Sequence, residues 1–257
     1  MSPARGAPRR RAFIAIAVVL ALLAAAVGGF AAWGLNAYRA EPGPLGQALA
    51  LPEVRIDIAD DAVVLTPADG GDGTGVVFYP GARVEAEAYA APWAPIVRDA
   101  GVTVVIPRMP LNFAVLAPGR ADTAAAAHGE GVDHWYLGGH SLGGAMAAAH
   151  AGGDPDLSLA GLVLWGSYAT EGAGLADRDD LRVLSVSGGQ DALSDPETID
   201  AARPHLPPDT EPVEIDGMNH AQFGAYGDQS GDGTARITDA DAHRVLAGAV
   251  TAFLTQD

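Results

Sequence analysis

Cysteine and lysine are both absent from this chain of 257 residues. Without cysteine the protein has no disulfide, no zinc site built on thiolates and no lipid attached through a lipobox cysteine. Apart from histidine, every cationic side chain is arginine, and 15 of them stand against 32 acidic residues, for a formal net charge of −17. Such an acidic chain argues against nucleic acid or an anionic membrane surface as a partner of the folded part. Apolar residues make up 49% of the chain, enough for one sizeable domain with a full core.

The N-terminal region has the pattern of a membrane anchor. An uncharged, apolar run over residues 12–38 follows Arg5, Arg9, Arg10 and Arg11, and about 20 apolar residues suffice to cross a bilayer as a helix. The positive-inside rule then puts residues 1–11 in the cytoplasm as a basic tail and the rest of the chain outside the cell membrane. The alternatives are a cleaved signal peptide, which would release a secreted protein, and a buried core helix. We expect residues 39–52 to form a linker and residues 53–257 the folded domain.

Short apolar runs alternate with helical patterns through this domain. Val54–Ile58 and Ala62–Thr66 alternate in polarity and are expected to pair as a hairpin. Continuous apolar runs, typical of strands inside a parallel sheet, then follow at Gly75–Tyr79, Val102–Ile106, His134–Leu137, Gly161–Trp165, Leu181–Ser187 and Pro212–Ile215. Helical segments lie between several of them, and Asp239–Leu254 closes the chain as an amphipathic helix. This order predicts an α/β fold with a doubly wound, mostly parallel sheet of about eight strands.

A strand, a turn and a helix meet around Ser141. The sequence Gly139-His140-Ser141-Leu142-Gly143 stands between an apolar run and an alanine-rich run, and strand, G-x-S-x-G, helix is the pattern of a nucleophile elbow. A serine on so sharp a turn has unusual backbone angles and close neighbours, for which the flanking glycines leave room. The turn also aims the first amides of the helix, including that of Leu142, at the space beside the hydroxyl. A plain glycine-rich turn before a helix is the alternative interpretation.

A serine hydroxyl needs a base within hydrogen-bond reach and an acid that orients the base. Asp191 and His220 each follow a predicted strand, so both belong at the carboxyl edge of the sheet. We therefore predict Ser141 as the nucleophile, Asp191 as the acid and His220 as the base. Asp195 and Glu171 are alternative acids, although Asp195 before a proline suits a helix cap. Of the other histidines outside the elbow, three are expected to be structural or solvated: His134, His150 and His243. His128 and His205 lack a sequence context that is compatible with the elbow.

Four sequence blocks now stand in the order found in α/β-hydrolases, and the chain resembles the small, dienelactone-hydrolase-like branch of that family. The blocks are V-V-F-Y-P-G-A-R-V-E (Val76–Glu85), G-G-H-S-L-G-G (Gly138–Gly144), G-G-Q-D (Gly188–Asp191) and N-H-A-Q-F-G-A-Y-G-D-Q-S-G-D-G (Asn219–Gly233). The resemblance implies the α/β-hydrolase fold and the same order of Ser, Asp and His. The nucleophile is Ser rather than the Cys of dienelactone hydrolases, so their substrate class does not carry over.

The family arrangement also indicates which residues surround the nucleophile. The second oxyanion donor comes from the loop after the strand at 75–79, where Ala82 is our candidate and Gly81 the close alternative. Gly81, Arg83 and His140 are candidates for contact with the substrate. Phe223, with Gln222 and Tyr226, is a candidate for the substrate-binding pocket wall.

Two loops give expectations about the size of the substrate and about a bound cation. Gly166–Ala176 is the only insertion in the usual position of a cap, and because it is short we expect an open, shallow site for a small or flexible acyl group. The segment Gly231-Asp232-Gly233 with Asp228 lacks the spacing of an EF-hand and is more typical of a turn than of a cation site. No metal or organic cofactor is expected.

These features together predict a serine hydrolase that cleaves a carboxylic ester of a small molecule through an acyl-enzyme, in a membrane-anchored domain outside the cytoplasm. Acyl transfer and amide cleavage use the same triad and remain alternatives. A non-catalytic binding module on the hydrolase fold is a third possibility.

Overall fold

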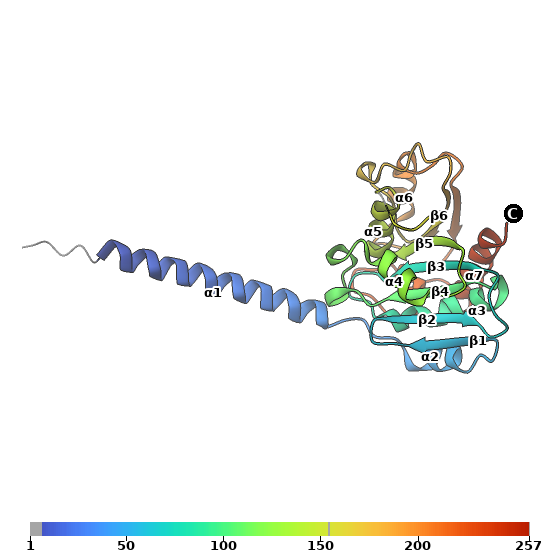
Figure 1. Ribbon diagram of the computed structural model, residues 1–257, viewed down its shortest axis with the longest axis horizontal. Coiled ribbons are helices and arrows are strands. Elements are labelled where there is room, and N and C mark those ends of the chain that lie inside the picture. The colour runs from blue at the N-terminus through green and yellow to red at the C-terminus, as the bar shows by residue number, and fades with distance from the viewer. Residues whose placement is uncertain (1–6, 154, 257) are drawn as a thin grey trace, which may run out of the picture.

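An eight-stranded sheet lies at the centre of the domain in the computed structural model, which describes residues 7–153 and 155–256 (Figure 1). The strand order is β1-β2-β4-β3-β5-β6-β7-β8. β2 runs antiparallel to both of its neighbours, and all other adjacent strands are parallel. The strands are β1 (Val54–Ile58), β2 (Ala62–Pro67), β3 (Thr74–Tyr79), β4 (Thr103–Pro107), β5 (His134–His140), β6 (Leu159–Trp165), β7 (Arg182–Gly188) and β8 (Glu211–Ile215). The predicted mostly parallel sheet of eight strands is confirmed.

Helices cover both faces of the sheet. α3 (Ala90–Ala100) and α7 (Asp239–Leu254) bury their apolar residues in one core. α4 (Arg120–His128) and α5 (Leu142–Ala151) contribute to a second core on the other face. Because both faces are covered, the last five residues of β3 are all buried, which explains its continuous apolar sequence. The loops hold α6 (Pro196–Ala201) and the 3-10 turns η1 (Ala86–Tyr89), η2 (Pro110–Asn112), η3 (Ala114–Leu116), η4 (Glu171–Ala173), η5 (Arg203–His205) and η6 (Ala221–Phe223).

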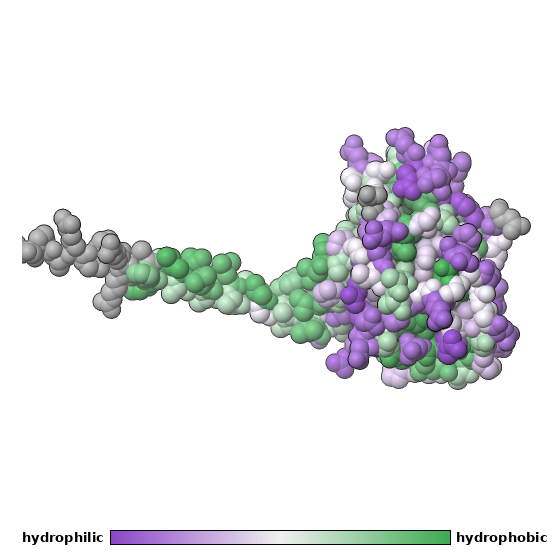
Figure 2. All heavy atoms as spheres, viewed as in Figure 1, coloured by the Kyte–Doolittle hydropathy of each residue, from purple (hydrophilic) through white to green (hydrophobic). Residues whose placement is uncertain are grey.

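One long helix, α1 (Ala7–Leu35), projects from the domain (Figure 1). Within its segment Phe13–Leu35, the most apolar window has a mean hydropathy of 2.7 and is 0% buried. Figure 2 shows hydrophobic residues along its visible side. The helix is therefore long and apolar enough to cross a membrane, and its exposure speaks against a buried core helix. Residues 1–6 of the predicted tail lie outside the described residues, and residues 7–11 form the first turns of α1.

The predicted linker at residues 39–52 is largely helical. α2 (Pro42–Leu49) occupies it, packs against β1 and α3, and buries Ala48. Pro42 and Pro44 fit at the start of this helix because the first amides of a helix have no acceptor within it. The segment is therefore part of the domain, and its proline content marks a helix start rather than an extended linker.

Candidate active site

Ser141 occupies a strained position between β5 and α5. Its backbone angles are φ 53° and ψ −128°, and a residue with a side chain held in such a region costs about 1–3 kcal/mol. Three backbone and side-chain contacts hold it there. Its N–H donates to Trp165 O (3.0 Å), while its carbonyl accepts from Ser167 Oγ (2.7 Å) and Ala145 N (3.1 Å). The predicted sharp turn between strand and helix is thus present at Ser141.

Close contacts explain the glycines on either side of the serine. A Cβ at Gly139 would lie 2.5 Å from the carbonyl carbon of Gly143. A Cβ at Gly143 would collide with the carbonyl oxygens of Tyr79 and Pro80, at the end of β3. The G-x-S-x-G spacing therefore lets α5 begin directly against the turn that follows β3.

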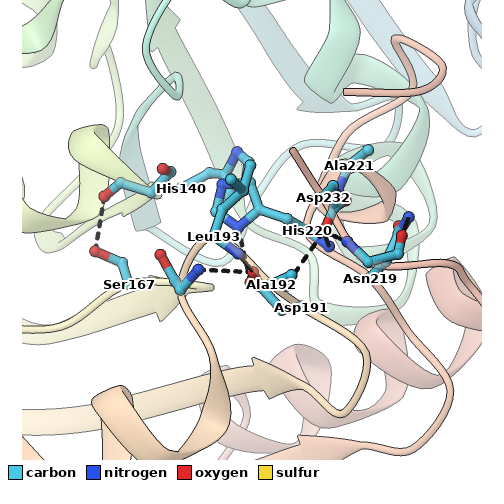
Figure 3. A network of polar contacts seen from close by, with 12 residues as sticks. His140, Ser167, Asp191, Ala192, Leu193, Asn219, His220, Ala221 and Asp232 are labelled. Carbon is cyan, nitrogen blue, oxygen red and sulfur yellow. Dashed lines mark hydrogen bonds and ion pairs between the residues drawn. The ribbon is translucent and has the colours of Figure 1, made fainter. Parts of the chain in front are cut away.

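Asp191 and His220 form a buried pair at the carboxyl edge of the sheet. His220 Nδ1 lies 2.7 Å from Asp191 Oδ2, and the two side chains are 1% and 0% exposed. The other oxygen of Asp191 accepts hydrogen bonds from the amides of Leu193 (2.8 Å) and Ser194 (2.7 Å). Figure 3 shows the carboxylate between its amide donors and the His220 ring. With the carboxylate fixed on both sides, His220 presents Nε2 away from Asp191.

Ser141 and His220 come from loops that lie against one another. The N–H of Ser141 donates to the carbonyl of Trp165, and the next residue is Gly166 (φ 48°). A Cβ on Gly166 would lie 3.1 Å from Asp191 Oδ2, so this segment touches both loops. The rings of His140 and His220 are centred 4.4 Å apart, which brings the elbow against the loop of His220. His220 Nε2 is buried without a hydrogen-bond partner among the described residues. In this structure no hydrogen bond joins it to Ser141 Oγ, a contact that often forms only with substrate bound.

The amides of Leu142 and Ala82 have no acceptor in the described part of the chain. Leu142 is the first residue of α5, where the helix leaves its N–H groups without partners. The amide of Gly81, by contrast, donates to the hydroxyl of Tyr89 (2.8 Å). Of the two residues that the sequence offers in the turn after β3, Ala82 is therefore the one with a free donor.

His140 lies beneath the site and is 1% exposed. Its Nδ1 lies 2.8 Å from the Tyr89 hydroxyl, the same group that accepts from Gly81. Burial, and secondly the neighbouring His220, hold the pKa of His140 well below the usual value for histidine. His140 is thus a neutral ring that joins the elbow to the turn after β3 through Tyr89, and it does not line an open pocket.

Two other predicted substrate contacts have different surroundings. The guanidinium of Arg83 lies over the rings of Trp33 (4.8 Å) and Tyr38 (5.4 Å) and donates to Asn36 O, so it is held at the end of α1. Phe223 is fully buried and packs with its ring centre 5.4 Å from that of His140. Both side chains support neighbouring elements in this structure, which sequence spacing alone did not indicate.

The remaining pocket candidates and alternative acids also have structural partners. Gln222 binds Asn219, Ile237 and Asp239, while Tyr226 donates to Gln229. Asp195 caps α6 by accepting from Thr198 N (2.8 Å), and Glu171 is exposed at η4. Three of the other histidines are bound elsewhere: His128 to Asp61, His150 to Asp122 and His243 to Gly224 O.

Asp232 holds the loop that carries His220, a role that the sequence did not reveal. Its oxygens accept from the amides of His220 (3.2 Å) and Ala221 (2.8 Å), and more distantly from Ala192 (3.4 Å) beside Asp191 (Figure 3). The carboxylate of Asp232, in the G-D-G pattern, therefore binds backbone amides. Among the described residues, no group of three or more His, Cys, Asp or Glu side chains is arranged to hold a metal ion.

Comparisons with known proteins agree with this architecture. The pattern of the Alpha/beta hydrolase family matches residues 75–244. No curated protein matches the chain. Among solved structures, the chain is similar to a thermostable esterase from Pseudomonas putida ECU1011 (16% identity, 84% of this chain and 89% of that chain, TM-score 0.53). It is also similar to a structure of fungal esterases from Rhizomucor miehei (16% identity, 83% of this chain and 85% of that chain, TM-score 0.57). A third similar structure is an arylesterase (14% identity, 82% of this chain and 88% of that chain, TM-score 0.54). At these identities the structures show a shared fold. The family match covers more than half of the sequence, so the chain belongs to the alpha/beta hydrolase family.

Proposed function

We propose that this chain is a serine hydrolase that cleaves a carboxylic ester with a small or flexible acyl group. The observation that carries the proposal is the buried pair of His220 and Asp191, 2.7 Å apart, next to a serine in a strained elbow. A buried aspartate and a histidine with a free Nε2 are the partners that a serine nucleophile requires.

The proposed reaction has two halves. In the first, His220 Nε2 takes the proton of Ser141 Oγ as this oxygen attacks the ester carbonyl, and the amides of Leu142 and Ala82 donate to the resulting oxyanion. His220 returns the proton to the leaving alcohol as the C–O bond of the ester breaks, which leaves an acyl group on Ser141. In the second half, His220 Nε2 accepts a proton from water as the water oxygen attacks the acyl carbon. His220 then donates this proton to Ser141 Oγ as the bond between the acyl carbon and Oγ breaks, which releases the acid and restores the serine. Asp191 accepts the Nδ1–H bond throughout and orients the ring.

The comparisons support this reaction class, since the similar solved structures are described as esterases. The sequence blocks at 76–85 and 219–233 support the dienelactone-hydrolase-like branch, with Ser141 in the place of a cysteine. The short segment after β6, which holds only the one-turn η4, supports an open site without a large lid.

We also propose that α1 anchors the catalytic domain outside the cytoplasmic membrane, with the arginine-rich end inside. The hydropathy of Phe13–Leu35 and the position of the arginines before it support this topology. The last turn of α1 is bound by the domain through Asn112 and Arg83, which supports a retained helix over a cleaved signal peptide.

The test is a comparison of the full chain with Ser141→Ala. The intact protein is expected to hydrolyse p-nitrophenyl acetate and to be labelled by a fluorophosphonate probe at Ser141. The variant is expected to lose at least about a thousandfold in kcat/KM and all labelling, with an unchanged thermal unfolding transition. Full activity in the variant would end the assignment, and an intact protein that neither turns over ester nor binds the probe would favour a non-catalytic module.

A further inference from the structure

The membrane-spanning helix is fixed to the domain without a free linker. Near its end, the rings of Phe30 and Trp33 pack on Phe113, with centres 5.3 and 5.2 Å apart. A Cβ on Gly34 would lie 2.7 Å from the carbonyl oxygen of Leu111, so the helix backbone touches this loop. Asn112 Nδ2 donates to the carbonyl of Gly34 (3.0 Å). The end of α1 and the loop Pro110–Leu116 therefore form one packed unit.

A second attachment lies at the turn after β3. Tyr38 N donates to Arg83 O (2.6 Å) and Glu85 N donates to Tyr38 O (3.0 Å), only three residues beyond the last residue of α1. The Arg83 guanidinium lies over the rings of Trp33 and Tyr38. The orientation of the domain relative to α1 is thus set at two places, and with it the orientation relative to the membrane.

Both attachments belong to the catalytic edge of the sheet. Arg83 follows Ala82, whose amide is the free donor in the turn after β3, and its own N–H donates to Asn112 O (2.8 Å). The loop Pro110–Leu116 follows β4, the parallel neighbour of β3. Its last turn, η3, contacts α5, which begins next to Ser141. The helix thus joins the domain at the edge of the sheet where β5 leads into α5 (Figure 1).

The same loop exposes apolar side chains. Val115 and Leu116 are 51% and 48% exposed, directly after the Phe113 ring that packs on Phe30. Phe30 lies five residues before the end of the span, or about 7.5 Å at 1.5 Å per residue. The loop therefore reaches the depth of the membrane interface, where Trp33 has its preferred location. Figure 2 shows hydrophobic surface that continues from α1 onto the adjoining side of the domain.

We propose that the loop Pro110–Leu116 rests in the outer interface of the bilayer, so that Ser141 receives an amphiphilic ester from that leaflet. The substrate class rests on the proposed hydrolase function, whereas the contact with lipid does not. An ester of a lipid-like molecule lies at the level of the head groups, beside the oxyanion turn that Arg83 ties to Trp33. The contact is apolar, so it does not conflict with a net charge of −17, which opposes binding to anionic lipid head groups.

The first experiment measures depth in the membrane. Since the chain has no cysteine, Leu116→Cys gives one site for an environment-sensitive fluorophore on the full protein in phosphatidylcholine vesicles. Leu49→Cys is the matched control, because Leu49 is also 48% exposed but lies at the end of α2, before the start of β1. We expect blue-shifted emission at position 116, and quenching by a lipid-attached spin label at least about twofold stronger than at position 49. Equal quenching at the two positions would overturn the proposal.

The second experiment measures substrate delivery. Leu116→Asp is expected to lower hydrolysis of 4-methylumbelliferyl oleate held in the same vesicles by about tenfold, because the charge is expelled from the interface. Hydrolysis of p-nitrophenyl acetate from water should stay within about twofold of the intact chain, and Leu49→Asp should change neither rate. An equal effect of Leu116→Asp on both esters, or none on either, would overturn delivery from the bilayer. If the intact chain hydrolyses neither ester, the hydrolase function fails, and the quenching result still decides the membrane contact.

Discussion

Asp232 accepts a hydrogen bond from the backbone amide of His220, although twelve residues separate them. The same carboxylate accepts from Ala221 (2.8 Å) and Gly233 (2.6 Å), and its neighbour Gly233 passes against Gln190 in the loop that carries Asp191. One acidic side chain therefore ties together the two loops that carry Asp191 and His220.

Replacement of Asp232 should misplace the base. Asp232→Ala leaves the amides of His220 and Ala221 without their acceptor, and we expect kcat to fall about tenfold with a small change in KM, since the substrate does not touch this residue. Asp232→Asn keeps one acceptor oxygen, so its kcat should lie between those of Asp232→Ala and the intact chain. Asp228→Asn, at an exposed position in the same loop, is the control and should behave as the intact chain. A rise in KM with kcat unchanged would contradict a positioning role.

The hydroxyl of Tyr89 should matter for both stability and rate. It accepts from the Gly81 amide and contacts His140, and all three residues are buried. Tyr89→Phe leaves a buried N–H unpaired, which we expect to cost about 1–3 kcal/mol in the free energy of unfolding and to lower kcat/KM by loosening the turn that carries Ala82. Urea unfolding and ester hydrolysis measure the two effects. Tyr226→Phe, which loses only a contact with Gln229, should cost less, and equal losses in the two variants would refute this account.

Stability should decrease as the pH falls below about 6.5, partly because of His140. The pKa of His140 is lowered in the folded protein, by burial first and by His220 second, so the unfolded chain takes up a proton that the folded chain refuses. The loss approaches about 1.4 kcal/mol per pH unit between the usual histidine pKa and the lowered one, and it is absent at higher pH. His243, whose pKa is also lowered by burial, acts in the same direction. We expect His140→Asn to reduce the slope of the unfolding free energy against pH between pH 6.5 and 5.5, measured by urea unfolding. An unchanged slope would be evidence against a contribution from His140.

The elbow should not tolerate a methyl group at Gly143. Gly143→Ala drives Cβ into the carbonyl oxygens of Tyr79 and Pro80, so α5 must move away from the oxyanion turn, and we expect esterase activity to fall at least about a hundredfold. Gly248→Ala in α7 is the control, since nothing lies within 4 Å of a Cβ there. That substitution should leave activity unchanged and stabilise the protein by about 0.5–1 kcal/mol. Activity within tenfold of the intact chain in Gly143→Ala would show that the elbow can shift at low cost.

Local chemistry explains how much of this site was predictable. A strand buried on both faces must be apolar throughout, so β3 and β6 were recognisable as continuous runs. The turn at Ser141 needs glycine at positions 139 and 143 for steric reasons. The G-x-S-x-G spacing that results is visible in the sequence alone. Asp191 and His220 were singled out because each lies in the loop after a strand, and parallel strands end at one edge. Their participation in the reaction stays a prediction.

Residues that act through distant contacts were not identifiable. Asp232 stands in a G-D-G turn with nothing to indicate that His220 and Ala192 would donate to it. Arg83 follows the oxyanion turn in sequence, yet its guanidinium extends to the end of α1. The prolines of α2 led us to predict a linker, because a helix that starts with proline and a flexible segment can have the same composition.

The sequence by itself determined the sheet, the elbow and an apolar helix long enough for a bilayer, because each depends on patterns within a few residues of one another. Only the tertiary structure decided which amides stay free, which carboxylate holds the loop of His220, and at which edge of the sheet α1 joins the domain. Those choices depend on contacts between residues such as Gly34 and Leu111, which lie far apart in the chain and meet only when the core packs.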